Sequence, residues 1–188
     1  MKEPFFTTIL TLSSHEPFEV PIEKIIKGDD RQSLYKNSVI YLDRSVGNFI
    51  EDVSTEKYYN NTVFIFISDH GFRVGDSSNR DKKRYHIPFF IYGVPLNNKW
   101  MGKKIAKVGS QSDLSKTILN QLNFKSDSFN FSNDIFINSS SFAQYTFSHG
   151  FGLVSDNQSL IFDYETKDVQ FSNKNTDLNN EGFFNVVK

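Results

Sequence analysis

The sequence contains no cysteine, which excludes disulfide bonds, thiolate zinc sites and a cysteine nucleophile. It also has no excess of positive charge, because 21 lysines and arginines are balanced by 22 aspartates and glutamates. A nucleic-acid surface needs basic residues to neutralise phosphates, so we expect no nucleic-acid partner. No apolar run approaches the length of a transmembrane helix, and the N-terminus lacks the basic-then-apolar order of a signal peptide, so the sequence shows no targeting segment.

The most informative stretch is residues 62–71. Val63 to Ile67 form an unbroken apolar run, which predicts a strand buried on both faces at the centre of a parallel sheet. The run leads into Asp69 and His70, and we expect Gly71 to provide the sharp turn that brings both side chains to the C-terminal edge of the sheet. A carboxylate beside an imidazole suits a divalent ion such as Mn²⁺, Zn²⁺ or Mg²⁺. The alternative is an aspartate that caps the next turn beside an incidental histidine.

Upstream of this stretch, the pattern predicts one more strand and a helix. Residues 5–12 are rich in strand formers and end in a polar segment that contains His15. An apolar run so near residue 1 suggests the C-terminal portion of a longer protein. Apolar residues at three- and four-residue steps then predict an amphipathic helix from an N-cap at Ser33 to about Val53. Strand, helix and strand in this order favour a right-handed parallel crossover.

Downstream, residues 72–85 predict an active-site loop. Its basic run at 82–84 is either a solvated approach to the next strand or a group that steers an anionic substrate. A strand is expected at 86–93 and a helix from about 110–113, with Asp113 as a carboxylate favoured at the helix start. Short alternating runs after residue 123 predict an antiparallel meander. We therefore expect an α/β core at 1–125 and a small antiparallel β subdomain with a tail at 126–188, both in one domain.

In this order, the segments resemble the C-terminal half of the sulfatase-like catalytic domain of lipoteichoic acid synthases and related phosphoglycerol transferases, in the alkaline phosphatase superfamily. The resemblance implies an α/β fold, the C-terminal portion of an alkaline phosphatase-like α/β/α sandwich, with a small C-terminal antiparallel sheet. Five motifs carry it: Thr11-Leu-Ser-Ser-His15-Glu-Pro-Phe18, Tyr41-Leu-Asp43, Asn61-Thr-Val-Phe-Ile-Phe-Ile-Ser-Asp69-His70-Gly71, Tyr85-His-Ile-Pro-Phe-Phe-Ile-Tyr92 and Ser110-Gln-Ser-Asp113.

The resemblance implies roles for matching residues. Asp69 and His70 match ligands of the catalytic divalent metal, usually Mn²⁺ in the phosphoglycerol transferases, with Zn²⁺, Mg²⁺ or Ca²⁺ as alternatives. His15 matches a histidine that contacts the substrate phosphate or the reacting oxygens, so it is a candidate catalytic and substrate-binding residue. His86 is a second candidate for substrate binding, and the alternative is an imidazole at a strand entry that is satisfied by backbone groups. His149, in the predicted meander, is left outside the site.

The resemblance also implies a serine or threonine nucleophile and at least one more acidic ligand upstream of residue 1. The threonines at positions 7, 8 and 11 lie inside a predicted strand and do not suit the role. The expected function is that of a metal-dependent hydrolase or phosphotransferase, which acts on phosphate or sulfate esters, possibly lipid-linked, together with the upstream half of the same protein. By itself the chain would bind metal weakly and turn over little. Full-length relatives of this kind are anchored in the cytoplasmic membrane with the catalytic domain outside. The alternative is a catalytically inactive module that serves binding or scaffolding.

Overall fold

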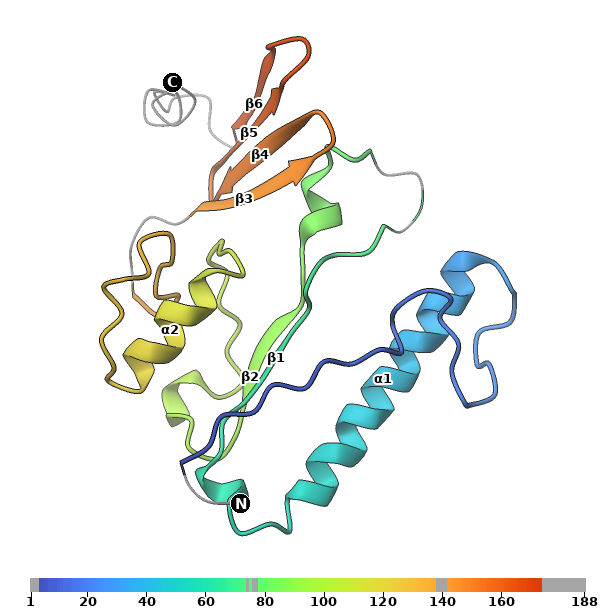
Figure 1. The fold of residues 1–188 in the computed structure, drawn as a ribbon, viewed down its shortest axis with the longest axis vertical. Coiled ribbons are helices and arrows are strands. Elements are labelled where there is room, and N and C mark those ends of the chain that lie inside the picture. The colour runs from blue at the N-terminus through green and yellow to red at the C-terminus, as the bar shows by residue number, and fades with distance from the viewer. Residues whose placement is uncertain (1–3, 74, 76–77, 138–141, 174–188) are drawn as a thin grey trace. The chain divides into compact units, whose positions relative to one another are not determined.

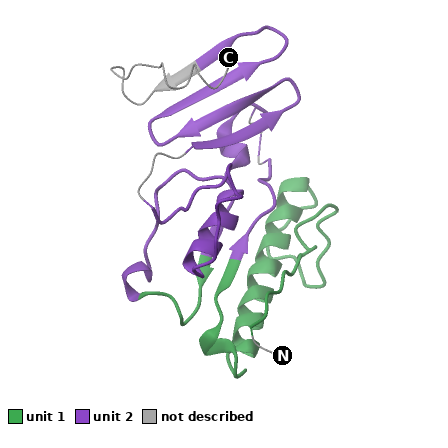
Figure 2. Ribbon diagram, turned by 60° about the vertical axis from the view of Figure 1, so that its left-hand side comes forward, with its two compact units in different colours: residues 1–65, 91–97 green, residues 66–90, 98–188 purple. Residues whose placement is uncertain are grey.

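The structure, a computed structural model, describes residues 4–73, 75, 78–137 and 142–173. They form two compact units (Figure 2): unit 1 holds the residues up to 65 together with 91–97, and unit 2 holds 66–90 and the residues from 98 onward. In the described part of the chain, no helix combines the length and the apolar character needed to cross a membrane. The elements, labelled in Figure 1, are α1 (Arg31–Val53), β1 (Phe64–Ile67), β2 (Phe89–Tyr92), α2 (Asp113–Gln121), β3 (Phe142–Phe147), β4 (Gly150–Ser155), β5 (Gln158–Asp163) and β6 (Val169–Asn173), with short 3₁₀ helices at Tyr59–Asn61, Lys82–Tyr85 and Asn98–Trp100.

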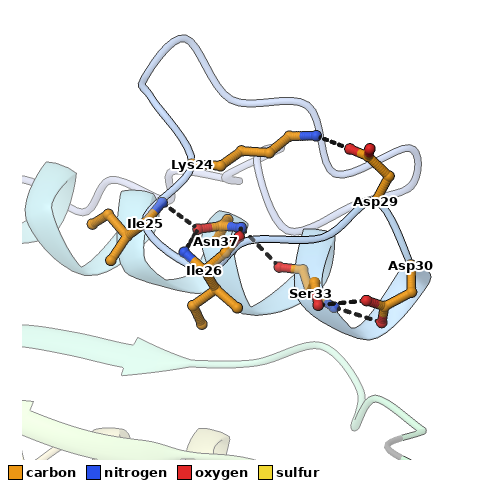
Figure 3. Close-up of polar contacts among 7 residues, drawn as sticks. All are labelled: Lys24, Ile25, Ile26, Asp29, Asp30, Ser33 and Asn37. Carbon is orange, nitrogen blue, oxygen red and sulfur yellow. Dashed lines mark hydrogen bonds and ion pairs between the residues drawn. The ribbon is translucent and has the colours of Figure 1, made fainter.

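Helix α1 is the amphipathic helix that the sequence predicts, but its N-cap is Asp30 rather than Ser33. The Asp30 carboxylate accepts the backbone N–H groups of Gln32 and Ser33 at 3.1 and 3.0 Å, which satisfies donors that a helix start leaves unpaired. Figure 3 shows the contacts between Asp30 and Ser33. Ser33 donates its hydroxyl to the same carboxylate at 2.5 Å. That hydrogen bond is the main reason why the pKa of Asp30 is lowered.

Asn37 ties the first turns of α1 to the segment that precedes the helix. Its side chain is 2% exposed. The amide oxygen accepts the N–H groups of Ile25 and Ile26 at 2.9 and 3.0 Å, and the amide nitrogen donates to the carbonyls of Ile26 and Ser33 (Figure 3). All four hydrogen-bonding positions of this buried amide are used, as burial of such a group requires.

The prediction of a strand over residues 5–12 is wrong. The segment has no strand conformation, and its apolar side chains other than Phe5 are exposed, with Leu10 86% exposed. Strand-forming residues supply propensity, but a strand also needs a neighbour for its backbone hydrogen bonds. No strand in the described part of the chain pairs with this segment. The predicted parallel crossover from it into β1 is therefore not formed among the described residues.

Strand β1 forms where the sequence predicts it, but its neighbour is β2, in a two-stranded sheet. The ring of Phe66 stacks on that of Phe90 at 4.6 Å, and the N–H of Ser68 donates to the carbonyl of Pro88. Phe66 thus lies beside Phe90, and Ser68 beside Pro88. Residue numbers rise along β1 where they fall along β2, so the two strands are antiparallel. β1 is half-buried along its length. A doubly buried strand in a parallel sheet was therefore the wrong expectation, although Pro88 does sit at a strand end, as predicted.

Helix α2 is held in unit 2 by buried polar side chains. The Asp113 carboxylate accepts the N–H groups of Ser110 at 2.8 Å and Asn133 at 2.7 Å. Asp113 and Thr117 are both almost fully buried, and the Thr117 hydroxyl accepts the N–H of Ile135 at 3.1 Å. Asp113 is the first residue of α2, as predicted, and its carboxylate also ties the turn before the helix to the segment around Asn133. In the same unit, the ring of Trp100 lies 5.1 Å from that of Phe136.

The antiparallel meander is confirmed as strands β3 to β6, each paired with the next along the chain (Figure 1). Leu153 and Leu160 face each other across β4 and β5 and form the most buried apolar pair of unit 2. Gly152 lies opposite Tyr145, where a Cβ atom would collide with the tyrosine ring. The expected tail after residue 173 lies outside the described residues. The expected boundary between residues 125 and 126 remains a prediction.

Candidate functional site

Asp69 and His70 follow directly after β1 and expose both side chains. One oxygen of Asp69 accepts the backbone N–H of His70 at 2.9 Å, and the other lies 3.7 Å from Nε2 of His70. Nδ1 of His70 is 3.0 Å from the carbonyl of Gly71, a contact that places the ring proton on Nδ1. Nε2 therefore keeps a free lone pair. A carboxylate oxygen of Asp69 and Nε2 of His70 thus lie side by side as possible metal ligands.

Gly71 is required here because of a close approach between two segments. A Cβ atom at this position would collide with the carbonyl of Arg84. Gly71 does not lie in the left-handed region of backbone conformation, unlike Gly75 and Gly93. The sharp turn expected of it is therefore not the reason why a glycine fits.

Gln111 holds the backbone on which Asp69 is mounted. Its side-chain nitrogen donates to the carbonyls of Ser68 and Asp69 at 2.8 and 3.3 Å. Gln111 lies just before α2, in the turn that Asp113 stabilises through the N–H of Ser110. The Ser110–Asp113 motif was noticed in the sequence, but a contact across more than forty positions could not be read from it.

His86 lies in the same unit as Asp69 and His70. Ser68 is hydrogen-bonded to Pro88, and Gly71 approaches Tyr85. His86 lies between Tyr85 and Pro88, so its backbone is opposite that of His70. Its imidazole is exposed. His15 belongs to unit 1, where it is exposed and its Nδ1 contacts the carbonyl of Glu16 at 2.8 Å. Three of the four candidates thus lie in unit 2, and the backbones of His70 and His86 lie opposite each other.

Among the described residues, this site offers a metal ion two donors, the carboxylate of Asp69 and the imidazole of His70. The part of the chain that the structure describes contains no group of three or more His, Asp, Glu or Cys side chains able to hold one ion. The chemistry of the two donors suits a divalent cation, since carboxylate oxygen and imidazole nitrogen are ligands of Mn²⁺ and Zn²⁺. Asp69 and His70 therefore fit part of a metal centre.

An open hollow of about 730 Å³ borders His70. The described residues of its lining come from the segment after β1 and its loop on one side, and from the end of β3 and the following turn on the other. They include two arginines, Arg73 and Arg84. Sequence reasoning marked 72–85 as an active-site loop but did not identify these two arginines as neighbours of His70. The basic run at 82–84 was the available signal, and only its last member lines the hollow.

The loop that forms this hollow is fixed to the meander. Arg80 makes an ion pair with the buried carboxylate of Asp163, and its guanidinium carbon lies 5.9 Å from the centre of the Phe147 ring. The hydroxyl of Tyr145 donates to the carbonyl of Arg80 at 2.9 Å, and the rings of Tyr145 and Tyr85 stack at 4.4 Å. Burial raises the pKa of Tyr145. A charged pair and an aromatic stack thus set the position of the loop.

A profile of the sulfatase family matches residues 2–124, which is well over half of the chain. The chain belongs to the sulfatase family. Lipoteichoic acid synthase-like YvgJ of Bacillus subtilis is 23% identical over 156 residues, which cover 72% of this chain and 25% of that protein. The lipoteichoic acid synthase of Staphylococcus aureus (strain USA300) is 33% identical over 75 residues, which cover 37% of this chain and 12% of that protein. This sulfatase-family chain therefore spans about a quarter or less of the length of these relatives.

Solved structures show the same fold. A protein in the alkaline phosphatase superfamily from Vibrio parahaemolyticus matches with a TM-score of 0.68 and 21% identity, over 92% of this chain and 44% of that chain. The lipoteichoic acid synthase LtaP from Listeria monocytogenes also matches with a TM-score of 0.68, at 22% identity, over 87% of this chain and 45% of that chain. The expected α/β fold of the alkaline phosphatase superfamily is confirmed, and with it the fold of a sulfatase-like hydrolase or transferase.

Proposed function

We propose that Asp69 and His70 supply two ligands of a catalytic divalent cation, foremost Mn²⁺, in a phosphotransferase or hydrolase that acts on phosphate or sulfate esters. The observation that carries this proposal is the 3.7 Å separation between a carboxylate oxygen of Asp69 and Nε2 of His70. Zn²⁺, Mg²⁺ and Ca²⁺ are the alternatives, and the nitrogen donor favours the transition metals over the last two. When bound, such an ion polarises a phosphoryl or sulfuryl oxygen and lowers the pKa of an attacking hydroxyl.

The backbone around the two ligands supports this role. The carbonyl of Gly71 holds Nδ1–H of His70 and so fixes the tautomer in which Nε2 carries the lone pair. Gln111 fixes the carbonyl groups of Ser68 and Asp69. A ligand pair whose backbone is held in this way loses less conformational freedom when an ion binds.

We assign His15 and His86 to the substrate. His15 is a catalytic and substrate-binding residue in this proposal. Its Nδ1 contacts the carbonyl of Glu16, so Nε2 is available to bind a substrate oxygen or to transfer a proton. His86 is exposed and lies across from His70, so we assign it to binding of the anionic group of the substrate.

The remaining ligands and the serine or threonine nucleophile belong, in this proposal, to an upstream half of a longer protein, with a lipid-linked ester as a possible substrate. That protein would be anchored in the cytoplasmic membrane and would act on its outer face or in the periplasm. The alternative is an inactive module for binding or scaffolding.

The test is calorimetric titration of this chain with Mn²⁺ and Zn²⁺, compared with Asp69→Ala and His70→Ala. The matched control is His149→Ala, because His149 is also an exposed histidine of unit 2 but pairs with Glu165. We expect weak saturable binding that both site variants lose and the control keeps. In a longer protein that carries the upstream half, Asp69→Ala should abolish turnover. Unchanged binding in Asp69→Ala, or near-normal turnover there, would contradict the assignment.

A further inference from the structure

The hollow beside His70 has the charge of an anion site. Ten described residues line it, and none of these is acidic. Two are arginines, and Ser78, Asn79, Thr146 and Ser148 add neutral hydrogen-bonding groups. Of the described carboxylates near the hollow, that of Asp163 pairs with Arg80, that of Asp81 accepts the backbone N–H of Lys83, and that of Asp69 lies beside His70 and is not among the described lining residues. Among the described residues, the lining itself therefore carries two positive charges and no negative one.

The two arginines differ from Arg80 in having no acidic partner among the residues that the structure describes. In the described part of the chain neither Arg73 nor Arg84 forms an ion pair, and the one side-chain hydrogen bond found for Arg73 runs from Nε to the carbonyl of Gly75 at 3.3 Å. Guanidinium groups bind phosphate and sulfate oxygens through two parallel N–H bonds. Unpaired arginines in a hollow are therefore suited to capture such a group.

Arg84 is also held in place before any ligand binds. Its carbonyl packs against Gly71, and the next residue, Tyr85, stacks on Tyr145 and donates its hydroxyl to the carbonyl of Asn79 at 2.8 Å. The backbone that carries Arg84 is thus fixed on both sides. A fixed backbone reduces the ordering cost of binding.

The size of the hollow exceeds what one tetrahedral anion needs. A volume of about 730 Å³ lies within the range of pockets that hold whole small-molecule ligands, roughly 300–1,000 Å³. Because the hollow begins at His70, a substrate whose reacting ester lies at Asp69 and His70 could extend into it.

We propose that the hollow binds a second anionic group of the substrate, a phosphate or sulfate separated from the reacting ester, through Arg73 and Arg84. This inference rests on the proposed function for its placement beside the reacting ester. The substrate class that follows is a molecule with at least two phosphate or sulfate groups.

The experiment is calorimetric titration of the chain with tripolyphosphate at fixed ionic strength in the presence of EDTA, so that no metal contributes. Arg84→Gln and Arg73→Gln each remove one positive charge from the lining. Lys83→Gln is the matched control, because Lys83 lies in the same 3₁₀ helix as Arg84 and carries the same charge but does not line the hollow. We expect saturable binding that each arginine variant weakens about tenfold, as loss of a charge-assisted pair predicts, and that Lys83→Gln leaves nearly unchanged.

Equal weakening in all three variants would mean attraction by net charge alone and would overturn the proposal, as would the absence of saturable binding. Parallel titrations with orthophosphate and sulfate distinguish the two chemistries, and both should bind more weakly than tripolyphosphate. The two proposals fail separately. Asp69→Ala should keep tripolyphosphate binding in EDTA, and Arg84→Gln should keep Mn²⁺ binding, so loss of one property does not entail loss of the other.

Discussion

The guanidinium of Arg80 pairs with the carboxylate of Asp163, which lies 83 positions further along the chain. Asp163 ends β5 and is 4% exposed at its side chain, while Arg80 belongs to the loop that lines the hollow beside His70. The pair therefore connects the meander to the loop within unit 2. Because the carboxylate is buried, its protonation state is coupled to the stability of this connection.

Replacement of Asp163 by asparagine should lower the melting temperature in a pH-dependent way. The pKa of Asp163 is lowered, first by the backbone N–H of Thr166 and also by Arg80. A lowered pKa means that the carboxylate stabilises the fold above its unfolded value of about 3.9, and that this contribution is lost as the pH falls through the folded value. The difference in melting temperature between wild type and Asp163→Asn should be full at pH 5–7 and shrink below about pH 4. Asp168→Asn, at an exposed position, serves as the control, and a difference that does not vary with pH would refute the coupling.

Two glycine-to-alanine substitutions should change stability in opposite directions. Gly152→Ala places a methyl group into the ring of Tyr145, which is itself stacked on Tyr85, and overpacking of this kind costs about 1–3 kcal/mol. Gly47 lies inside α1 with open space around its Cβ position, so Gly47→Ala should stabilise by about 0.5–1 kcal/mol through helix propensity. Urea denaturation measures both. A stable Gly152→Ala would show that the stack can move.

Removal of the Asp113 carboxylate should destabilise unit 2. Asp113→Ala leaves the backbone N–H groups of Ser110 and Asn133 without their acceptor, and each unsatisfied buried donor costs about 1–3 kcal/mol. Asp127→Ala removes the same charge from an exposed position of the same unit and should change the free energy of unfolding by less than about 0.5 kcal/mol. Similar losses in both variants would indicate a general charge effect instead.

Gln111 is expected to act as a positioning residue for the proposed metal ligands. Gln111→Ala removes the donor to the carbonyls of Ser68 and Asp69, so the Mn²⁺ affinity should fall by about tenfold, the lower end for loss of an outer-shell partner. The thermal transition without metal should change little, since the side chain is exposed. Gln144→Ala, at an exposed position of β3, is the control. Unchanged Mn²⁺ affinity in Gln111→Ala would show that the ligands do not depend on this contact.

Local pattern was enough to predict α1, α2, β1 and the meander, because periodicity and turn residues act within a few positions of each other. It failed over residues 5–12, where the apolar run is present but the pairing partner that a strand requires is a property of other segments. It also predicted the wrong N-cap for α1. Asp30 and Ser33 are both good capping residues, and the sequence alone does not show which of them caps the helix.

The candidate site was predictable in part for the same reason. Asp69 and His70 stand out because they directly follow an apolar run, and His86 because it precedes another. Arg73 and Arg84 gave no comparable signal. Of the three arginines, Arg80 alone has an acidic partner among the described residues, and that partner, Asp163, lies 83 positions away. Gln111 was missed because its contact with Ser68 spans 43 positions.

Trp100, packed beside Phe136, is the only tryptophan of the sequence, and it belongs to unit 2. Its fluorescence emission is therefore an intrinsic probe of unit 2 alone, whereas the far-ultraviolet circular dichroism of the chain is weighted towards α1, the longest helix, in unit 1. Denaturation followed by both signals on one sample would compare the two units without any label. Coincident curves would mean that the units unfold together, and separated curves would give each unit its own stability.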